Sequence, residues 1–360
     1  MAIVSDVMMS LGGAEMVVME LLKIFPKADF YTLFICPKAR KKIEDAYPKV
    51  RIKTSVFQWL IWGDIISKYI SIIKIFSWIY WEFLNLNDYD LIISSSHSYM
   101  AKNVKKKSGV KHLSYVHTPP RYLYDEFSEI VWIKKIPGKW LFWPIASLLK
   151  YVDKRGSIRP DVMIANSKNV ADRIKKYYGR EAQIIYPPVK VDFSKKNIKR
   201  GDYFVCLSRL VLQKGIDLAV KVCTENKIPL IVIGNGDELG NLKKMAGPGI
   251  KFMEKCDDNK KFEILSEARA LIYTSKEEDF GIVPVEALKL GTPVIAYNSG
   301  GVRETVLHKK NGVLFENFNE DSLMKAIKLY KTLEINKNFC IESVKKYSAK
   351  NFERQIKDLI

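Results

Sequence analysis

The stretch ALIYTSKEEDFGIVPVEALKLGTPVIAY, residues 270–297, holds two short apolar runs separated by a polar loop and a helical segment. The runs Ala270–Tyr273 and Val294–Tyr297 predict β-strands. Pro284 suits the first turn of a helix between them, because no partner is needed there for the N–H that proline lacks. A strand, a crossover helix and a second strand form the repeating unit of a parallel sheet. This stretch therefore predicts an α/β fold.

The same alternation extends outward along both halves of the chain. The further predicted strands are Leu91–Ser95, Lys111–Val116, Val162–Ala165, Tyr203–Leu207, Leu230–Ile233, Lys251–Met253 and Val313–Phe315. A length of 360 residues suits two domains of roughly 150 to 200 residues each. We predict two Rossmann-like domains, residues 1–190 and 191–340, with a linker at about 187–200 that begins at Pro187. Residues 341–360 predict a final helix that packs back on the first domain.

Composition narrows the class of protein. Hydrophobic residues make up 48% and charged residues 28%, which excludes a disordered or fibrous chain. The net charge of +19 favours phosphate-bearing partners, so a non-catalytic protein that binds nucleic acid or an anionic membrane is one alternative. The five cysteines are scattered, without a C-x-x-C spacing, and the first residues lack a basic leader. These features predict a cytoplasmic protein without a disulfide framework or zinc site.

Residues 56–86 form an aromatic insertion in the first domain. Its tryptophans are Trp59, Trp62, Trp78 and Trp81. Asp64, Lys68 and Lys74 interrupt the segment, so it lacks the ~20 apolar residues that a spanning helix needs. Tryptophan with lysine is typical of membrane interfaces, whereas aromatic stripes at helical spacing are also typical of cores. The segment is therefore predicted either to line a helical core or to bind the inner face of a membrane peripherally.

The loop of the opening stretch carries the strongest functional signal. The N–H groups of Phe280, Gly281 and Ile282 are expected at the positive end of a helix, which is a phosphate-binding arrangement. Glu278 and Glu286 flank those groups and have oxygens that accept hydrogen bonds from sugar hydroxyls. A loop with two solvated glutamates is the alternative for the pair taken alone.

Two neighbouring segments place further polar groups at the carboxyl end of the predicted sheet, where open α/β folds bind ligands. Ser208 ends a strand, and Arg209 and Lys214 follow it as cations that could neutralise a diphosphate. Gly234 and Gly236 form a turn after the next strand, which would let backbone approach a ligand, although a tight turn needs glycine anyway.

The first domain contributes two motifs. Gly12 and Gly13, in the segment Ser10–Glu15, follow the first strand and open a helix. The G-x-G-x-x-G fingerprint is absent, which argues against a classical NAD site. His117 follows the strand Lys111–Val116 and precedes two prolines that stiffen its loop. A lone histidine is usually structural, and the stiffened loop makes a binding or catalytic role the alternative.

The run from Ser275 to Ile295 resembles the Glu-x7-Glu region of retaining enzymes in glycosyltransferase family 4, which have the GT-B fold: two Rossmann-like domains facing each other across a cleft. The resemblance implies that Glu278 binds the donor sugar, that the backbone of 280–282 binds the diphosphate, and that Glu286 binds the nucleotide ribose. Arg209 and Lys214 would hold the same diphosphate.

The resemblance also implies roles for the remaining motifs. The turn at Gly234 and Gly236 would lie beside the nucleotide base, Gly12 and Gly13 would lie over the donor phosphate, and His117 would contact the donor sugar. The His-Thr-Pro-Pro-Arg-Tyr pattern at 117–122 is close to GDP-mannose-dependent mannosyltransferases of surface-polysaccharide synthesis.

The implied activity is transfer of a hexosyl group, mannose from GDP-mannose, to a lipid-linked glycan. A UDP-sugar transferase or an epimerase of the same fold is the alternative, and nucleic acid is not an expected partner. No metal is implied, because protein cations meet the diphosphate charge. Asp88 and Asp90 precede the strand Leu91–Ser95, so we interpret them as a strand-start turn at the opposite edge from the ligands.

Overall fold

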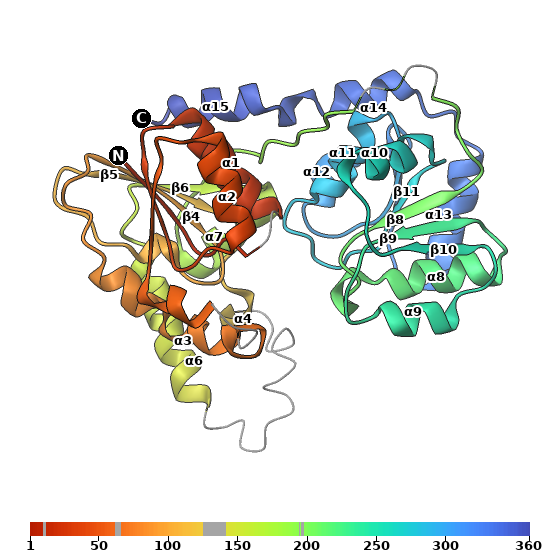
Figure 1. The fold of residues 1–360 in the computed structure, drawn as a ribbon. Coiled ribbons are helices and arrows are strands. Elements are labelled where there is room, and N and C mark those ends of the chain that lie inside the picture. Colours follow the sequence, from red (N-terminus) through yellow and green to blue (C-terminus); the bar gives the residue numbers. More distant parts are fainter. Residues whose placement is uncertain (10–11, 62–65, 125–141, 194, 196–197) are drawn as a thin grey trace. The chain divides into compact units, whose positions relative to one another are not determined.

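Two parallel β-sheets, one in each half of the chain, organise the fold in the computed structural model (Figure 1). The structure describes residues 1–9, 12–61, 66–124, 142–193, 195 and 198–360. The chain divides into unit 1, which is Met1–Pro188 with Phe352–Ile360, and unit 2, which is Val189–Asn351. The predicted α/β class is confirmed, because every registered strand pair in both sheets is parallel.

The sheet of unit 1 has the strand order β3-β2-β1-β4-β5-β6-β7. Its strands are β1 (Ala2–Ser5), β2 (Asp29–Thr32), β3 (Arg51–Thr54), β4 (Leu91–Ser96), β5 (Lys111–Val116), β6 (Val162–Ala165) and β7 (Gln183–Ile184). The chain builds outward from β1 to β3 and then returns to the other side of β1 with β4. The junction of β1 and β4 is therefore the topological switch point, whose carboxyl edge is where such sheets bind ligands.

Helices cover both faces of this sheet, because alternate strand residues are apolar on both sides. Ile3 packs with α1 (Gly13–Ile24) and α2 (Pro37–Ala46), whereas Val4 packs on the opposite face. The remaining helical elements are η1 (Val56–Ile61), α3 (Ile66–Phe83), η2 (Ala101–Asn103), α4 (Arg121–Tyr124), α6 (Phe142–Gly156) and α7 (Lys168–Tyr178).

The last helix, α15 (Ala349–Lys357), packs on the sheet of unit 1. Phe352 and Ile356 are buried in the same core as α1, and the Phe352 ring meets Tyr115 of β5 edge to face at 5.8 Å. The Nζ of Lys111 donates to the backbone oxygen of Ile360 at 3.2 Å. The preceding helix α14 (Lys337–Ser343) lies in unit 2, so the segment 341–360 is split between the two units.

The sheet of unit 2 has the order β10-β9-β8-β11-β12-β13. Its strands are β8 (Phe204–Leu207), β9 (Leu230–Ile233), β10 (Ile250–Met253), β11 (Leu271–Tyr273), β12 (Val294–Tyr297) and β13 (Gly312–Phe315). Here the chain builds outward from β8 to β10 and returns beside β8 with β11. The switch point of unit 2 therefore lies between β8 and β11.

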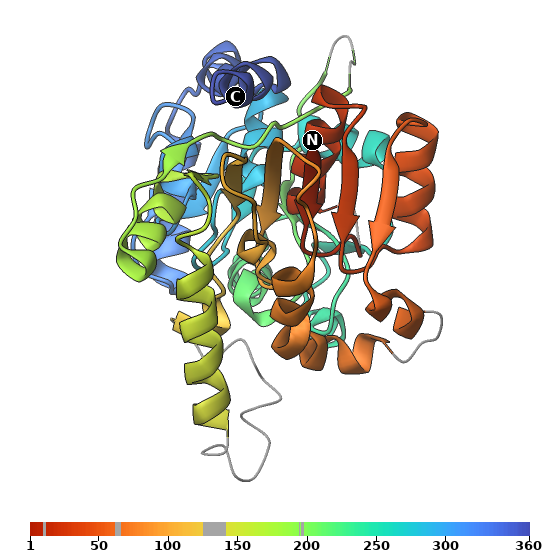
Figure 2. The ribbon, with the colours of Figure 1, turned by 90° about the vertical axis from the view of Figure 1, so that its left-hand side faces the viewer.

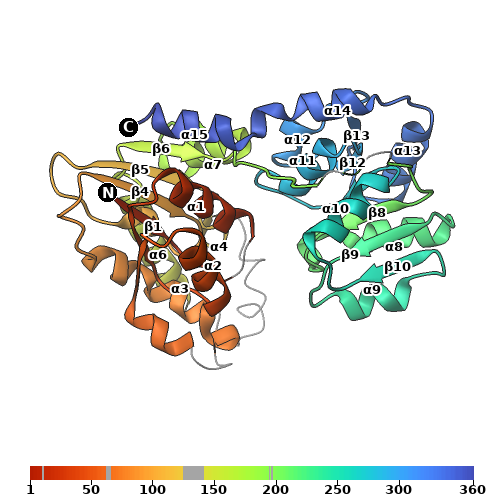
Figure 3. The ribbon, with the colours of Figure 1, turned by 45° about the horizontal axis from the view of Figure 1, so that its top comes forward.

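The helices of unit 2 form two layers, one on each face of its sheet. One face is covered by α8 (Ile216–Glu225), α9 (Leu239–Met245) and α13 (Glu320–Lys331), whose buried side chains share one core with β8, β9 and β13. Figure 3 shows α11 (Ile282–Lys289), α12 (Val302–Thr305) and α14 grouped together, apart from α8 and α9. The remaining helical elements of this unit are η4 (Leu212–Lys214), α10 (Asp258–Glu267) and η5 (Lys345–Tyr347).

The aromatic insertion has both buried and exposed aromatic side chains. Trp81 is fully buried, and its indole N–H donates to the Tyr99 oxygen at 2.6 Å, so this ring is core. Trp59 is 84% exposed, and Phe76 and Phe83 of α3 are also exposed. Trp62 and the side chains of Lys68 and Lys74 lie outside the described residues. Among the described helices, none is long and apolar enough to span a bilayer.

A second exposed apolar surface lies on α6, which sequence reasoning did not single out. Leu148 and Tyr151 are 52% and 64% exposed and stand three residues apart, on one side of the helix. Both α3 and α6 pack against η2, and Figure 2 shows them at the lower end of unit 1. The exposed apolar residues of α6 and those of α3 in the insertion therefore belong to two helices that pack against the same element, η2.

Candidate functional site

Two loops meet at the switch point of unit 2. The loop after β8 carries Lys214, and the loop after β11 carries Glu278. The two strands are neighbours, paired through Leu271 and Val205, so their carboxyl ends lie side by side. The sequence places these residues 64 positions apart, and the fold brings their side chains into contact.

Glu278 is the centre of a hydrogen-bonded cluster. Its Oε2 accepts from the Nζ of Lys214 at 2.5 Å, from the hydroxyl of Tyr273 at 2.7 Å and from the Oγ of Ser275 at 2.8 Å. Burial raises the pKa of Glu278, but the charge of Lys214 and these three hydrogen bonds outweigh it, so the pKa is lowered. Glu278 is therefore held as a carboxylate in a fixed orientation at neutral pH.

Backbone contacts fasten the two loops together. The Oγ1 of Thr274 donates to the Lys214 oxygen at 3.0 Å, and the N–H of Lys276 donates to the Gln213 oxygen at 3.1 Å. Gly215 has φ +59°, and a Cβ there would lie 2.8 Å from the Thr274 oxygen. The close approach of the loops therefore needs a glycine at this position.

A third loop, directly after β12, supports the acidic loop and was not identified from the sequence. The N–H of Glu277 donates to the Oγ of Ser299 at 3.0 Å, and the N–H of Gly301 donates to the Glu278 oxygen at 2.8 Å. Glu277 has φ +52°, a strained value for a residue with a side chain, and these bonds help to hold it. The Ser-Gly-Gly signature at the end of a predicted strand was the available signal.

Replacing Gly300 with alanine should destabilise unit 2. Gly300 has φ +58°, and an added Cβ would collide with the backbone of Glu278, whose nitrogen would lie 2.9 Å away. Left-handed strain and overpacking together predict a loss of about 2–5 kcal/mol in the free energy of unfolding. Gly179→Ala is the matched control, because Gly179 has φ +67° but open space, so only about 1–2 kcal/mol of strain applies. Urea unfolding that gives equal losses for both variants would contradict the packing role.

The helix after the acidic loop begins where the sequence predicts. Gly281 is the N-cap of α11 with φ +87°, Ile282 is the first helical residue, and Pro284 lies in the first turn. The Phe280 side chain is buried and meets the Tyr347 ring edge to face at 5.2 Å. Phe280 can therefore offer a ligand its backbone but not its ring, and α11 presents its positive end beside Glu278.

Glu286 lies further along α11, in a different environment from Glu278. Its Oε1 is 3.5 Å from the Nζ of Lys261, which also pairs with Asp258 at 2.8 Å. Burial raises the pKa of Glu286, and the charge of Lys261 reduces this shift without cancelling it. Two glutamates predicted from one motif thus have opposite pKa shifts, because only Glu278 has three donors on one oxygen.

The other predicted residues of unit 2 lie on the segments that follow β8 and β9. Arg209 is exposed, and the Oγ of Ser208 donates to the Arg209 oxygen at 2.7 Å. Gly234 and Gly236 have φ values of +144° and +157°, and a Cβ on either would collide with the backbone of residues 208–210. These glycines are therefore needed to pack the turn against its own chain, whatever ligand it meets.

In unit 1 the predicted residues lie at the carboxyl edge of the sheet. His117 follows β5 and is buried, with its Nε2 2.8 Å from the Oγ of Ser95. The Nδ2 of Asn166 donates to the His117 oxygen at 3.0 Å. Gly12 is the N-cap of α1, and Gly13 is its first residue; both are exposed. Ser10, in the same predicted loop, lies outside the described residues.

Two aspartates of unit 1 are potential metal ligands by residue type. Asp88 and Asp90 are exposed immediately before β4, at the edge of the sheet where strands begin. Within the described part of the chain, no group of three or more His, Cys, Asp or Glu side chains is arranged to hold a metal ion.

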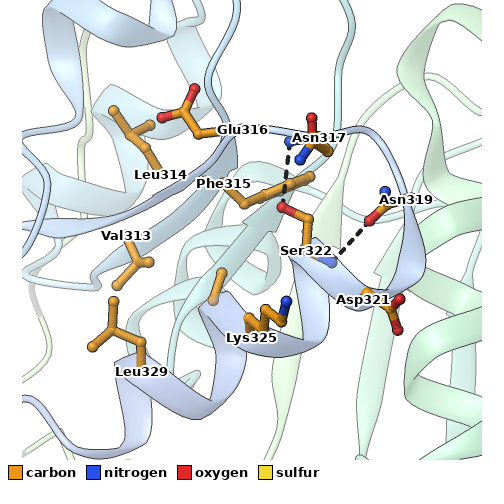
Figure 4. Close-up of a pocket in the computed structure, with 11 residues that line it drawn as sticks. Val313, Leu314, Phe315, Glu316, Asn317, Asn319, Asp321, Ser322, Lys325 and Leu329 are labelled. Carbon is orange, nitrogen blue, oxygen red and sulfur yellow. Dashed lines mark hydrogen bonds between the residues drawn. The ribbon is translucent and has the colours of Figure 1, made fainter.

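A hollow of about 440 Å³ lies elsewhere in unit 2, between β13 and α13 (Figure 4). Three of its polar residues bond to one another: the N–H of Ser322 donates to the Oδ1 of Asn319 at 2.9 Å, and the N–H of Asn317 donates to the Oγ of Ser322 at 3.3 Å. The residues found to line it include none of the predicted site residues. The candidate site is therefore the loop cluster at the switch point and not this hollow.

Known proteins resemble the chain along most of its length. The profile described as Glycosyltransferase Family 4 matches residues 11–193, and the profile described as Glycosyl transferases group 1 matches residues 189–347. The alpha-1,3/1,6-mannosyltransferase ALG2 of Rhizomucor pusillus is 23% identical over 85% of this chain and 78% of its own length.

Two further similarities concern a shorter relative and a solved structure. A GDP-mannose-dependent alpha-(1-6)-phosphatidylinositol monomannoside mannosyltransferase of Mycobacterium tuberculosis is 28% identical over 51% of this chain and 56% of its own. The structure of HepE from Anabaena, solved with UDP, superposes with a TM-score of 0.72 at 16% identity and covers 99% of both chains. The superposition over the whole chain confirms the predicted fold.

Proposed function

Because the chain belongs to glycosyltransferase family 4, we propose that it is a retaining transferase that moves a mannosyl group from GDP-mannose to a glycan on a lipid carrier. The observation that carries this proposal is the cluster in which Lys214, Tyr273 and Ser275 fix the Glu278 carboxylate beside the positive end of α11. A carboxylate beside an anion-binding helix end suits a ligand that has sugar hydroxyls next to a diphosphate.

The donor is inferred from the relatives. Both sequence relatives described above are named mannosyltransferases, and one is named as GDP-mannose-dependent. HepE was solved with UDP, so a UDP-sugar is the second candidate donor.

In the proposed reaction, the bond between the sugar C1 and the diphosphate oxygen breaks as the acceptor oxygen bonds to C1. Lys214, Arg209 and the first amides of α11 stabilise the charge that develops on the leaving diphosphate. The acceptor hydroxyl proton passes to an oxygen of that diphosphate, which departs on the same face. Glu278 orients the sugar through its hydroxyls, Glu286 binds the ribose, and His117 is proposed to contact the sugar.

In this proposal, Lys214, Arg209 and the positive end of α11 balance the diphosphate charge. The reaction is therefore proposed to proceed without a metal ion. The Lys214 ammonium is already oriented by Glu278, which reduces the entropy lost when a diphosphate binds. A cytoplasmic location, where nucleotide sugars are available to the enzyme, is part of the same proposal.

A donor panel tests the proposal. GDP-mannose, other GDP-sugars and UDP-sugars are incubated with the protein, and release of the nucleoside diphosphate is measured with and without excess EDTA. We expect slow hydrolysis that is fastest with GDP-mannose and unaffected by EDTA. If a UDP-sugar is hydrolysed fastest, the assignment of GDP-mannose as the donor is wrong. A requirement for added divalent metal would overturn metal independence. No hydrolysis together with no nucleotide binding would reject the proposal that the protein is a transferase.

The lipid-linked acceptor is proposed from the exposed surfaces of α3 and α6. The exposed apolar side chains of α6 stand among Lys150, Lys154 and Arg155, which are exposed too. The acidic residue of α6, Asp153, is buried and paired with Lys102. An apolar surface with basic residues around it suits an anionic membrane leaflet.

The protein should bind vesicles that contain phosphatidylglycerol and bind phosphatidylcholine vesicles less. Each lysine near the surface contributes about 1 kcal/mol, which salt screens, whereas burial of apolar side chains is not screened. Binding should therefore weaken with salt without vanishing, and the double variant Leu148→Ser, Tyr151→Ser should reduce what remains. Leu212→Ser in unit 2, 65% exposed, is the control. Equal vesicle binding by the double variant and the control would show that α6 is not part of the membrane-binding surface.

A further inference from the structure

The switch point of unit 1 is occupied by a buried carboxylate, Asp6, which directly follows β1. Its Oδ2 accepts from the backbone N–H groups of His97 at 2.7 Å and Tyr99 at 2.8 Å. Its Oδ1 accepts from the N–H of Ala101 at 2.7 Å. All three donors belong to the loop after β4, so one side chain spans the junction of β1 and β4 and fixes the loop 97–101.

The loop 97–101 needs such an anchor. Met100 has φ +63°, a left-handed conformation that is unfavourable for a residue with a side chain. Charge-assisted hydrogen bonds from backbone N–H groups to a carboxylate are among the stronger ones in proteins. Three of them converging on Asp6 therefore hold the loop in a shape that its sequence does not favour.

The same loop supports the segment that contains His117. The hydroxyl of Tyr122, in α4, donates to the Ser98 oxygen at 3.0 Å. Tyr122 lies five residues after His117, beyond the two prolines that stiffen the connection. At the other end of the segment, the His117 ring is bonded to Ser95, the residue whose backbone oxygen accepts from the Asp6 N–H at 3.3 Å.

We infer that Asp6 is a positioning residue for the proposed reaction: it fixes the loop 97–101, and through Tyr122 it sets the place of the His117 segment, which the proposed function assigns to the donor sugar. This inference rests on the proposed function only for its effect on catalysis. Asp6 acts through other residues, because it is 5% exposed and both its oxygens are engaged by backbone donors.

The pKa of Asp6 indicates how the residue affects the overall stability of the fold. Burial raises its pKa to about 6, although the hydrogen bonds from Tyr99, Ala101 and His97 and the charge of Lys102 lower it. The folded-state pKa lies above the ordinary value, so ionisation of Asp6 opposes folding as the pH rises through about 6. An asparagine avoids this cost but offers one oxygen where the carboxylate offers two. Asp6→Asn should therefore loosen the loop without a matching loss of overall stability.

Hydrogen exchange tests the positioning directly, with no need for substrate. The wild type, Asp6→Asn and Tyr122→Phe are compared by mass spectrometry over peptides that cover 97–101 and 117–124. We expect at least tenfold faster exchange in both segments for Asp6→Asn, and in 117–124 for Tyr122→Phe. The melting temperature of Asp6→Asn at pH 8 should stay within about 4 °C of the wild type. Tyr122→Phe removes one hydroxyl, so it tests the link even if Asp6→Asn folds poorly.

Asp29→Asn is the matched control. Asp29 is also a buried acid of unit 1, but it begins β2, and its carboxylate bonds Arg51 at 2.8 Å and Lys53 at 3.1 Å. This variant should leave exchange in both segments unchanged. Unchanged exchange at 97–101 in Asp6→Asn, or faster exchange there that does not reach 117–124, would overturn the inference.

The catalytic effect is measured on donor hydrolysis. Asp6→Asn should lower kcat at least tenfold and leave the Kd for GDP within twofold, because Lys214, Arg209 and Glu286, which the proposal assigns to the nucleotide, belong to unit 2. An unchanged kcat in a variant with faster exchange would overturn the positioning role in catalysis. If the wild type neither binds GDP nor hydrolyses a donor, the proposed function fails, and the exchange experiment still decides whether Asp6 positions the His117 segment.

Discussion

Replacing Lys214 with alanine should lower kcat/KM for donor turnover by about 30- to 5,000-fold, or roughly 2–5 kcal/mol in transition-state stabilisation. The variant loses the ammonium that we assign to the diphosphate. It also loses the 2.5 Å ion pair that orients Glu278, so ground-state and transition-state contacts both suffer. Steady-state kinetics of nucleoside diphosphate release would measure the change.

The control for this prediction is Lys221→Ala on α8. Lys221 is half-exposed and pairs with Glu320 at 2.6 Å, so its loss removes one surface ion pair of small energetic value. We expect wild-type kinetics for it. Arg209→Ala tests the second cation. Near-wild-type kcat/KM for Lys214→Ala in a folded protein would contradict the assignment of Lys214 to the diphosphate. The same result for Arg209→Ala would leave Lys214 as the one side-chain cation assigned to the diphosphate.

Glu278→Gln should reduce kcat by about 100-fold or more, which corresponds to roughly 3 kcal/mol. The amide has the shape of the carboxylate but no charge for Lys214. Its nitrogen is a donor, so it suits the hydroxyls of Tyr273 and Ser275 poorly and leaves a sugar hydroxyl with one acceptor fewer. A variant that binds the nucleotide as the wild type does, yet turns over the donor slowly, would match a role in orienting the sugar. Unchanged kcat would reject that role.

The same variant should also change how stability depends on pH. The pKa of Glu278 is lowered on folding, so the unfolded state binds more protons in the range between the two pKa values. The contribution of the carboxylate to stability is therefore fully present above the ordinary pKa near 4.5 and is lost as the pH falls through the folded-state value. The difference in unfolding free energy between wild type and Glu278→Gln should be constant above about pH 5.5 and shrink below 4.5.

Most of the fold could be predicted, because strands buried on both faces are short apolar runs between turn residues. Leu230–Ile233 and Val294–Tyr297 have the predicted bounds, and Tyr203–Leu207 differs by one residue at its start. The aromatic insertion could not be resolved in the same way. Trp81 and Trp59 are the same residue type in one segment, and only packing against Tyr99 separates a buried ring from an exposed one.

The candidate site, too, could be predicted only in part. Chain order shows which loops follow which strands, and so predicts that Lys214 and Glu278 lie at one edge of a sheet. It does not show that Lys214, Tyr273 and Ser275 all donate to one oxygen of Glu278. Nor does it show that the turn at Ser299 holds the acidic loop. Those contacts depend on which strands are neighbours and on the angle at which each loop leaves its strand.

By itself, the sequence determined the α/β class, the family and the loops that carry the polar residues, because these follow from local apolar periodicity and from motifs within about 30 residues. Only the tertiary structure decided which groups contact one another. Asp6 shows why: nothing near it in the chain needs a carboxylate, and its three donors stand 91 to 95 residues away. Strand order brings them together at the junction of β1 and β4, where the three N–H groups offset part of the cost of burying the carboxylate.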